Sequence, residues 1–188
     1  MNDADLSHLF WARSAFVSAM FFFGAIAALT ACTVPARLAK IEPLPRNRWI
    51  GLAGGWIALA LCVPHAVAVA PDFLLPFLWP LALVTPILGF FFVDYPAARA
   101  VGGLLILQGY TLVHYPFDLE LSGFPVLAVT GWLAGIAGIW VSAQPWAMRD
   151  YLRLAARSTA FRLTGTLFWS AAALLGLGAL ISTFGGGK

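Results

Sequence analysis

Charged residues are scarce in this chain. Lys, Arg, Asp and Glu make up 10% of its 188 residues, whereas about a quarter of a soluble domain is charged. With 61% hydrophobic residues, such a chain cannot cover a water-facing surface, so its solvent is lipid. Within lipid only helices and closed barrels satisfy the hydrogen bonds of the backbone. Because the apolar runs are continuous rather than alternating, they exclude a barrel and predict an all-helical, polytopic membrane protein.

Few residues are suited to enzyme chemistry. The two cysteines are expected at opposite depths, Cys32 near the inner end of the first span and Cys62 near the outer end of the second, which disfavours a disulfide. The sequence contains no Cys-x-x-Cys, His-Glu-x-x-His or Gly-x-Ser-x-Gly motif and no glycine-rich phosphate loop. This composition favours a non-catalytic role.

Six apolar stretches are long enough, or nearly so, to cross a bilayer as helices. A hydrocarbon core of roughly 30 Å needs about 20 helical residues, and the fourth stretch is the shortest of the six. Because no linker separates the stretches, we expect one helical transmembrane domain over residues 1–188. The predicted spans are residues 14–34, 49–69, 73–93, 99–114, 124–143 and 160–184.

Basic residues fall on alternate connections between these spans. The connections after the first, third and fifth spans hold Arg37, Lys40, Arg46, Arg48, Arg99, Arg149, Arg153 and Arg157. The other two connections carry Asp72, Asp118 and Glu120 and no basic residue. Because basic loops stay in the cytoplasm, this pattern predicts both termini outside, in a bacterial inner membrane. The net charge of +3 then belongs to the cytoplasmic face and does not indicate nucleic-acid binding.

An arginine followed three residues later by a glycine opens three of the predicted spans. The pairs are Arg48 and Gly51, Arg99 and Gly102, and Arg162 and Gly165. Arginine at the start of a span can reach the lipid phosphates, and glycine one turn later lets a neighbouring backbone approach closely. The repetition predicts three helical hairpins that all turn on the basic side of the membrane.

Small residues also recur at the spacing of helix packing. Gly51 and Gly55 lie in the second span, and Gly131, Gly135 and Gly138 run through the fifth. The first and sixth spans repeat the pattern with Gly24 and Ala28 and with Ser170 and Ala173. Such faces allow close contact between helices in lipid, either within this chain or with a partner subunit.

The third span contains Pro76, Pro80 and Pro86 and should be kinked or broken. Broken helices line the binding sites of transporters, so this span raises the hypothesis of a small transporter. The simpler interpretation is a bent helix that fills an irregular bundle.

Two histidines are expected at similar depths near the outer face. His65 and His114 lie 17 and 15 residues after the arginines that open their spans, so their depths differ by only about 3 Å if the helices start level. Such a pair can ligate haem b iron or, with a nearby carboxylate, a transition metal. Gln108, Thr111 and His114 share one face of the fourth span, which can bind a quinone. Histidines are also common at membrane interfaces, because their polar tips reach water.

An amphipathic helix is predicted between the fifth and sixth spans, at about residues 145–158. Arg149, Arg153 and Arg157 follow one another at four-residue spacing and share one face. On the cytoplasmic surface of the membrane, this face would contact anionic headgroups or an acidic partner.

The sequence as a whole predicts a non-catalytic membrane subunit that scaffolds a larger complex through contacts with lipid and with other membrane protein subunits. Two alternatives stay open. One is a redox subunit that binds haem b or quinone near the outer face through His65 and His114. The other is a small transporter built around the proline-containing third span.

Overall fold

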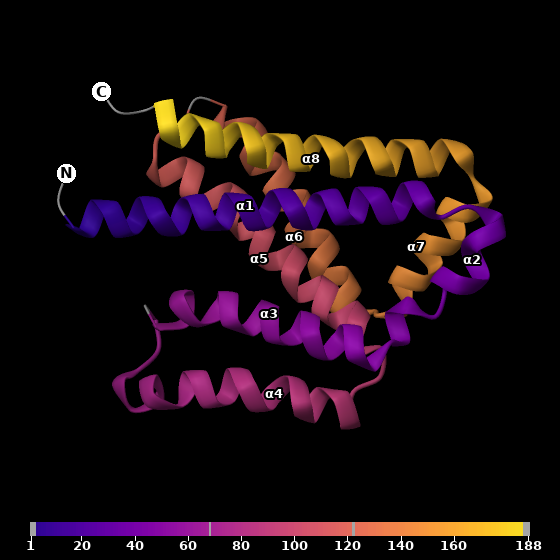
Figure 1. The fold of residues 1–188 in the computed structure, drawn as a ribbon, viewed down its shortest axis with the longest axis horizontal. Coiled ribbons are helices and arrows are strands. Elements are labelled where there is room, and N and C mark those ends of the chain that lie inside the picture. The colour runs from indigo at the N-terminus through magenta and orange to yellow at the C-terminus, as the bar shows by residue number, and fades with distance from the viewer. Residues whose placement is uncertain (1–2, 68, 122, 186–188) are drawn as a thin grey trace. The chain divides into compact units, whose positions relative to one another are not determined.

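The computed structural model describes residues 3–67, 69–121 and 123–185, which form helices and no strand, with 90% of the structure helical. The predicted all-helical class is confirmed. Figure 1 shows the helices, which in chain order are α1 (Asp3–Cys32), α2 (Pro35–Ile41), η1 (Leu44–Arg46), α3 (Arg48–Val67), η2 (Asp72–Phe77), α4 (Leu78–Phe92), α5 (Pro96–Asp118), α6 (Phe124–Ala143), α7 (Trp146–Arg157) and α8 (Thr159–Gly185). The two elements labelled η are short 3-10 helices.

Five helical segments are long and apolar enough to cross a membrane, as in a multi-pass membrane protein. They are Ser7–Cys32, Arg48–Val67, Asp72–Phe92, Phe124–Ala143 and Thr159–Phe184. Each coincides with a predicted span except for a few residues at its ends. The remaining predicted span, residues 99–114, lies within α5, which is not one of the five.

The chain divides into two compact units, each built from separate stretches of sequence. The first unit comprises Met1–Arg37, Gln108–Gly135 and Leu154–Lys188, and the second comprises Leu38–Leu107 and Ile136–Arg153. Helices α2, α5, α6 and α7 contribute residues to both. The sequence predicts one domain because it contains no linker, and units that interleave along the chain have no linker at their boundary.

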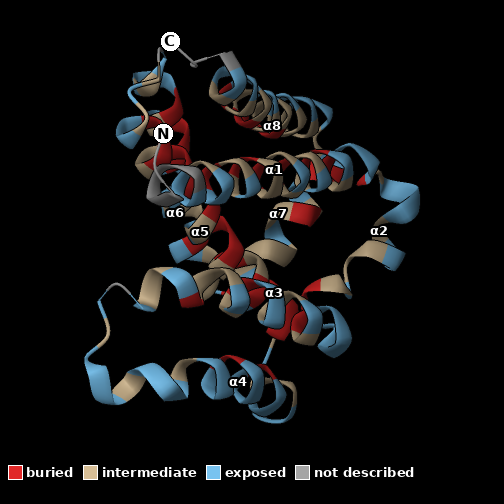
Figure 2. Cartoon of the chain, turned by 60° about the vertical axis from the view of Figure 1, so that its left-hand side comes forward, coloured by how far each residue is buried: buried red, intermediate tan, exposed pale blue. Residues whose placement is uncertain are grey.

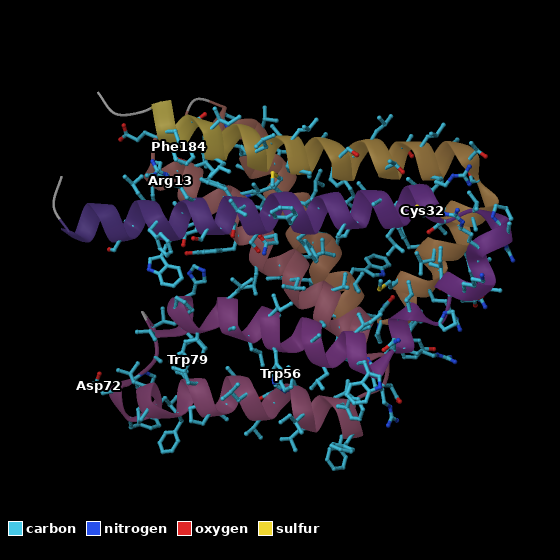
Figure 3. All side chains as sticks on the ribbon, in the orientation of Figure 1. Arg13, Cys32, Trp56, Asp72, Trp79 and Phe184 are labelled. Atoms are coloured by element: carbon cyan, nitrogen blue, oxygen red, sulfur yellow. The ribbon has the colours of Figure 1, made fainter. Side chains whose placement is uncertain are left out.

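Helices α1 and α8 lie side by side in the first unit (Figure 1). The buried residues of α1 recur every three or four positions, so they form one stripe along the helix (Figure 2): Ala12, Phe16, Ala19, Phe23, Ala27 and Thr30. Phe23 stacks on Trp169 of α8, with ring centroids 5.7 Å apart. At one end of the pair (Figure 3), the Arg13 guanidinium lies 4.0 Å from the centre of the Phe184 ring.

Helices α3 and α4 form the corresponding pair in the second unit. The Trp56 indole Nε1–H of α3 donates a hydrogen bond of 2.9 Å to the Leu83 carbonyl of α4 (Figure 3). Towards the start of α3, the Trp49 and Phe90 rings meet edge to face at 5.1 Å. Residue numbers that rise along α3 fall along α4, so the two helices are antiparallel.

The prolines of the third span change the type of its helix. The segment containing Pro76 is the 3-10 helix η2, and the α-helical geometry of α4 begins at Leu78, two residues before Pro80. Pro86 lies inside α4 and is buried. Proline in the first turn of a helix removes no hydrogen bond that the helix needs, whereas an interior proline removes one.

Candidate functional site

A groove lined by small side chains lies between α1 and α8 in the first unit. It has a volume of about 450 Å³ and is lined by Gly24, Ala27, Ala28 and Ala31 of α1 and by Thr166, Ser170, Ala173 and Leu174 of α8. The lining residues are spaced so that each set occupies one face of its helix. Both sets belong to segments that are apolar enough to span a membrane. The groove therefore lies between two of the segments that are long and apolar enough to cross a membrane.

Gly24 in this groove has no close neighbour that would require glycine. A Cβ atom at Gly24 would meet nothing within 4 Å, whereas one at Gly176 on α8 would lie 3.4 Å from the Met20 backbone nitrogen. Glycine inside a helix costs up to about 1 kcal/mol relative to alanine. Gly176 thus lies in contact with α1, whereas no contact within this chain accounts for Gly24.

Gly51 and Gly55, two of the predicted packing glycines, lie against other segments of the second unit. A Cβ atom at Gly51 would come within 2.6 Å of Pro96 at the start of α5, and one at Gly55 within 3.2 Å of Pro86. Pro86, the interior proline of α4, therefore packs on Gly55 of α3. The repeated Arg-x-x-Gly pattern here provides the close helix approach for which glycine is suited.

The predicted packing glycines of α6 lie along α5. In the first unit, a Cβ atom at Gly131 would lie 2.6 Å from the carbonyl oxygen of Gly109. In the second unit, a Cβ atom at Gly138 would lie 2.6 Å from the carbonyl oxygen of Gly102. A Cβ atom at Gly135 would meet nothing within 4 Å. Gly102 was expected to let a neighbouring backbone approach closely, whereas Gly109 was not predicted as a packing residue. The available signal for Gly109 is its spacing: Gly102 and Gly109 are seven residues, or about two turns, apart on α5, as Gly131 and Gly138 are on α6.

The polar stripe predicted on the fourth span lies on α5 in the first unit. Gln108 and Thr111 are buried, with 2% and 5% of their surfaces exposed. The Gln108 Nε2 donates a hydrogen bond of 3.0 Å to the Ser18 Oγ of α1. The Gln108 Oε1 is also buried but has no hydrogen-bond partner in the described part of the chain. This acceptor could take a hydrogen bond from a ligand.

His114 is held by aromatic and acidic neighbours at the end of α5. Its Nε2 lies 3.2 Å from the Asp118 Oδ2, and its ring stacks on Tyr110 with centroids 4.8 Å apart. The His8 Nε2 of α1 lies 3.8 Å from the same Asp118 oxygen. Asp118 was expected near the outer face, whereas no role was predicted for His8, because only the fold brings α1 to this end of α5.

His65 belongs to α3 in the second unit, whereas His114 belongs to the first. The predicted haem or metal site formed by these two histidines therefore joins residues of different units and stays a prediction. Among the described residues, no group of three or more His, Cys, Asp or Glu side chains is arranged to hold a metal ion.

The predicted basic face of α7 is divided between the two units. In the second unit, the Arg153 Nε donates a hydrogen bond of 2.8 Å to the Glu42 Oε1, and the Arg149 Nε is buried without a hydrogen-bond partner among the described residues. Arg157 is exposed and belongs to the first unit. Glu42 was missed, although it is the one acidic residue of the basic first connection.

No protein family model matches this chain, and neither curated proteins nor solved structures show a significant similarity to it. The functional argument therefore depends on the geometry described above.

Proposed function

We propose that this chain is a non-catalytic subunit of a larger membrane protein complex, and that the groove between α1 and α8 receives a transmembrane helix of a partner protein. The observation that carries this proposal is the small-residue lining of the groove around Gly24. Helices associate in lipid by close packing, because lipid tails are as apolar as the helices themselves. A groove of small residues allows the backbone of a further helix to approach closely.

The chemistry of the lining favours a helix over a lipid acyl chain. Thr166 and Ser170 add hydroxyl oxygens to the α8 side of the groove, and the Thr166 hydroxyl donates a hydrogen bond of 2.8 Å to the Arg162 carbonyl of its own helix, which leaves its oxygen as an acceptor. An acyl chain offers no partner to a hydroxyl, whereas a helix offers carbonyl oxygens and polar side chains. Gly24 and Ala28 are four residues apart, the spacing at which small residues form contact faces between membrane helices.

Buried hydroxyl groups elsewhere in the first unit are consistent with a structural role. Thr30, Thr33 and Thr130 each donate a hydrogen bond to the carbonyl four residues earlier in the chain, at 2.7–2.9 Å. These bonds satisfy the hydroxyl groups locally. They need no substrate or water to complete them.

The topology that accompanies this proposal has six spans in three hairpins, with the fourth span within α5 and both termini outside a bacterial inner membrane. Helix α5 is less apolar than the others because it contacts helices rather than lipid: α1 and α6 in the first unit, and α3 and α6 in the second. Fusion of alkaline phosphatase to the C-terminus should give active enzyme, and a fusion after Lys40 should not. The opposite result would contradict this orientation.

A matched pair of glycine substitutions tests the subunit proposal. A Cβ atom added at Gly24 meets no atom within 4 Å and lies in the groove lining. One added at Gly178 also meets nothing within 4 Å, and Gly178 does not line the groove. Gly24→Leu should therefore fold and lose a stoichiometric partner on purification from native membranes, by about tenfold or more if 1.4 kcal/mol of packing is lost. Gly178→Leu should retain that partner.

Three results would overturn the proposal. The first is purification of the wild-type chain from gently solubilised membranes with no stoichiometric partner. The second is equal retention of the partner by the Gly24→Leu and Gly178→Leu variants. The third is a second copy of this chain as the only partner found, which would assign the groove to self-association rather than to a larger complex.

The alternative function is a redox subunit, and the surroundings of His114 favour it specifically. A histidine that binds a metal usually has its other ring nitrogen fixed by a carboxylate, and the His114 Nε2 lies 3.2 Å from Asp118. Haem b bound through the other nitrogen would give a Soret band in the reduced-minus-oxidised spectrum of the purified chain. His114→Ala and His65→Ala should abolish this band, and a colourless chain would contradict the alternative.

A further inference from the structure

Three arginines and one glutamate surround a cavity in the second unit. The cavity has a volume of about 300 Å³ and is lined by Ala39, Glu42, Pro43, Arg46, Arg149 and Arg153. The lining comes from α2, from the segment that follows it and from α7. Three guanidinium groups and one carboxylate give the lining an excess of positive charge.

Each arginine is held differently. Arg153 is paired with Glu42 through both its Nε and its Nη2. Arg46 donates to the Tyr95 hydroxyl oxygen, and its guanidinium lies 4.8 Å from the centre of the Tyr95 ring. The buried Arg149 Nε lies 3.6 Å from the Asp150 Oδ1, an ion-pair contact that is too long for a hydrogen bond, and it has no hydrogen-bond partner among the described residues. One buried cationic donor therefore remains unsatisfied at this cavity.

We infer that this cavity binds the phosphate of an anionic phospholipid headgroup. A buried donor without a partner is costly, and a phosphate oxygen would satisfy it with a charge-assisted hydrogen bond. Guanidinium groups present donors in a planar fork that matches phosphate. The volume is also at the lower end of the range for small-ligand sites, which suits a headgroup.

The position of the cavity along the chain favours lipid as the source of the phosphate. Arg46 lies two residues before the span that begins at Arg48. Its hydrogen-bond partner Tyr95 lies three residues after the span that ends at Phe92. Arg149 follows the span that ends at Ala143 by six residues. The ends of three spans therefore meet at this cavity, at the depth where basic residues reach lipid phosphates.

Native mass spectrometry of the full-length chain in detergent can measure this binding, with dioleoyl-phosphatidylglycerol and dioleoyl-phosphatidylcholine as probes. The wild-type chain should bind one phosphatidylglycerol in preference to phosphatidylcholine. Arg149→Gln should weaken this binding by about tenfold, the effect of losing one charge-assisted hydrogen bond. Arg157→Gln is the matched control: it removes an arginine from the same helix outside the cavity lining and should change the affinity less than about twofold, the change expected for an exposed charge.

A third variant gives an effect that misfolding cannot imitate. Glu42→Gln removes the carboxylate that pairs with Arg153 and should make phosphatidylglycerol bind more tightly, because Arg153 is then available to the phosphate. Equal binding of the two lipids, or equal losses in Arg149→Gln and Arg157→Gln, would overturn the inference. Displacement of the lipid by millimolar inorganic phosphate would assign the cavity to soluble phosphate instead. The inference does not depend on the proposed partner helix.

Discussion

Alanine substitutions at two glycines of α5 should change the stability of the chain in opposite directions, because only one of the two glycines lies closely against α6. A Cβ atom at Gly109 would lie 2.5 Å from the Gly131 carbonyl oxygen and 2.9 Å from the Gly135 nitrogen, so α5 and α6 must move apart locally. Overpacking of this kind costs about 1–3 kcal/mol. At Gly103 an added Cβ meets nothing within 4 Å, and replacement of a helical glycine by alanine gains up to about 1 kcal/mol. Gly109→Ala should therefore destabilise the chain, whereas Gly103→Ala should leave it unchanged or stabilise it.

Unfolding in mixed micelles with increasing sodium dodecyl sulfate, followed by the fluorescence of the 8 tryptophans, measures this difference. The free energy of unfolding of Gly109→Ala should fall by about 1–3 kcal/mol relative to wild type, and that of Gly103→Ala should not fall. Equal stability of the two variants would refute the close backbone contact between α5 and α6. So would a larger loss in Gly103→Ala than in Gly109→Ala.

Three further predictions concern single contacts, each read against wild type. The double variant Ser18→Ala/Gln108→Leu should be as stable as wild type or more stable. The reason is that it removes the buried Gln108 Oε1, which has no hydrogen-bond partner among the described residues and whose burial costs about 1–3 kcal/mol. A clear loss of unfolding free energy in the same assay would mean that this oxygen has a partner. Arg13→Gln removes hydrogen bonds to the end of α8, so amide hydrogen exchange should accelerate at residues 181–184 and not in the middle of α8. Trp56→Phe removes the indole hydrogen bond between α3 and α4 and should cost about 0.5–1.5 kcal/mol; no loss of unfolding free energy would contradict that bond.

The membrane spans are the part of the fold that the sequence predicts best. Lipid thickness fixes their length, and continuous apolar runs such as residues 124–143 are visible without any knowledge of tertiary structure. Helix α5 is harder because it contacts protein on several sides. Its buried Gln108 and Thr111 and its contact glycines lower its hydropathy, so its apolar stretch is the shortest of the six predicted spans, and α5 is not among the five segments that are apolar enough to cross a membrane.

The candidate sites depend on adjacency, which a single sequence does not encode. Glu42 and Arg153 are 111 residues apart in the chain yet form an ion pair, and His8 and Asp118 come together only because α1 packs near the end of α5. Spacing predicts a contact face, as it does for Gly24 and Ala28, but it does not identify what lies opposite. Only the structure shows that α8 forms the other side of this groove.

Site-specific photo-crosslinking in native membranes tests the proposed subunit role most directly. A photoreactive amino acid placed at Ala28, which is exposed and lines the groove, should crosslink to one partner membrane protein. The same probe at Leu167, which is 68% exposed on α8 but does not line the groove, should not crosslink to that protein. Crosslinks from Ala28 only to lipid or to a second copy of this chain, or equal crosslinking from both positions, would contradict the account.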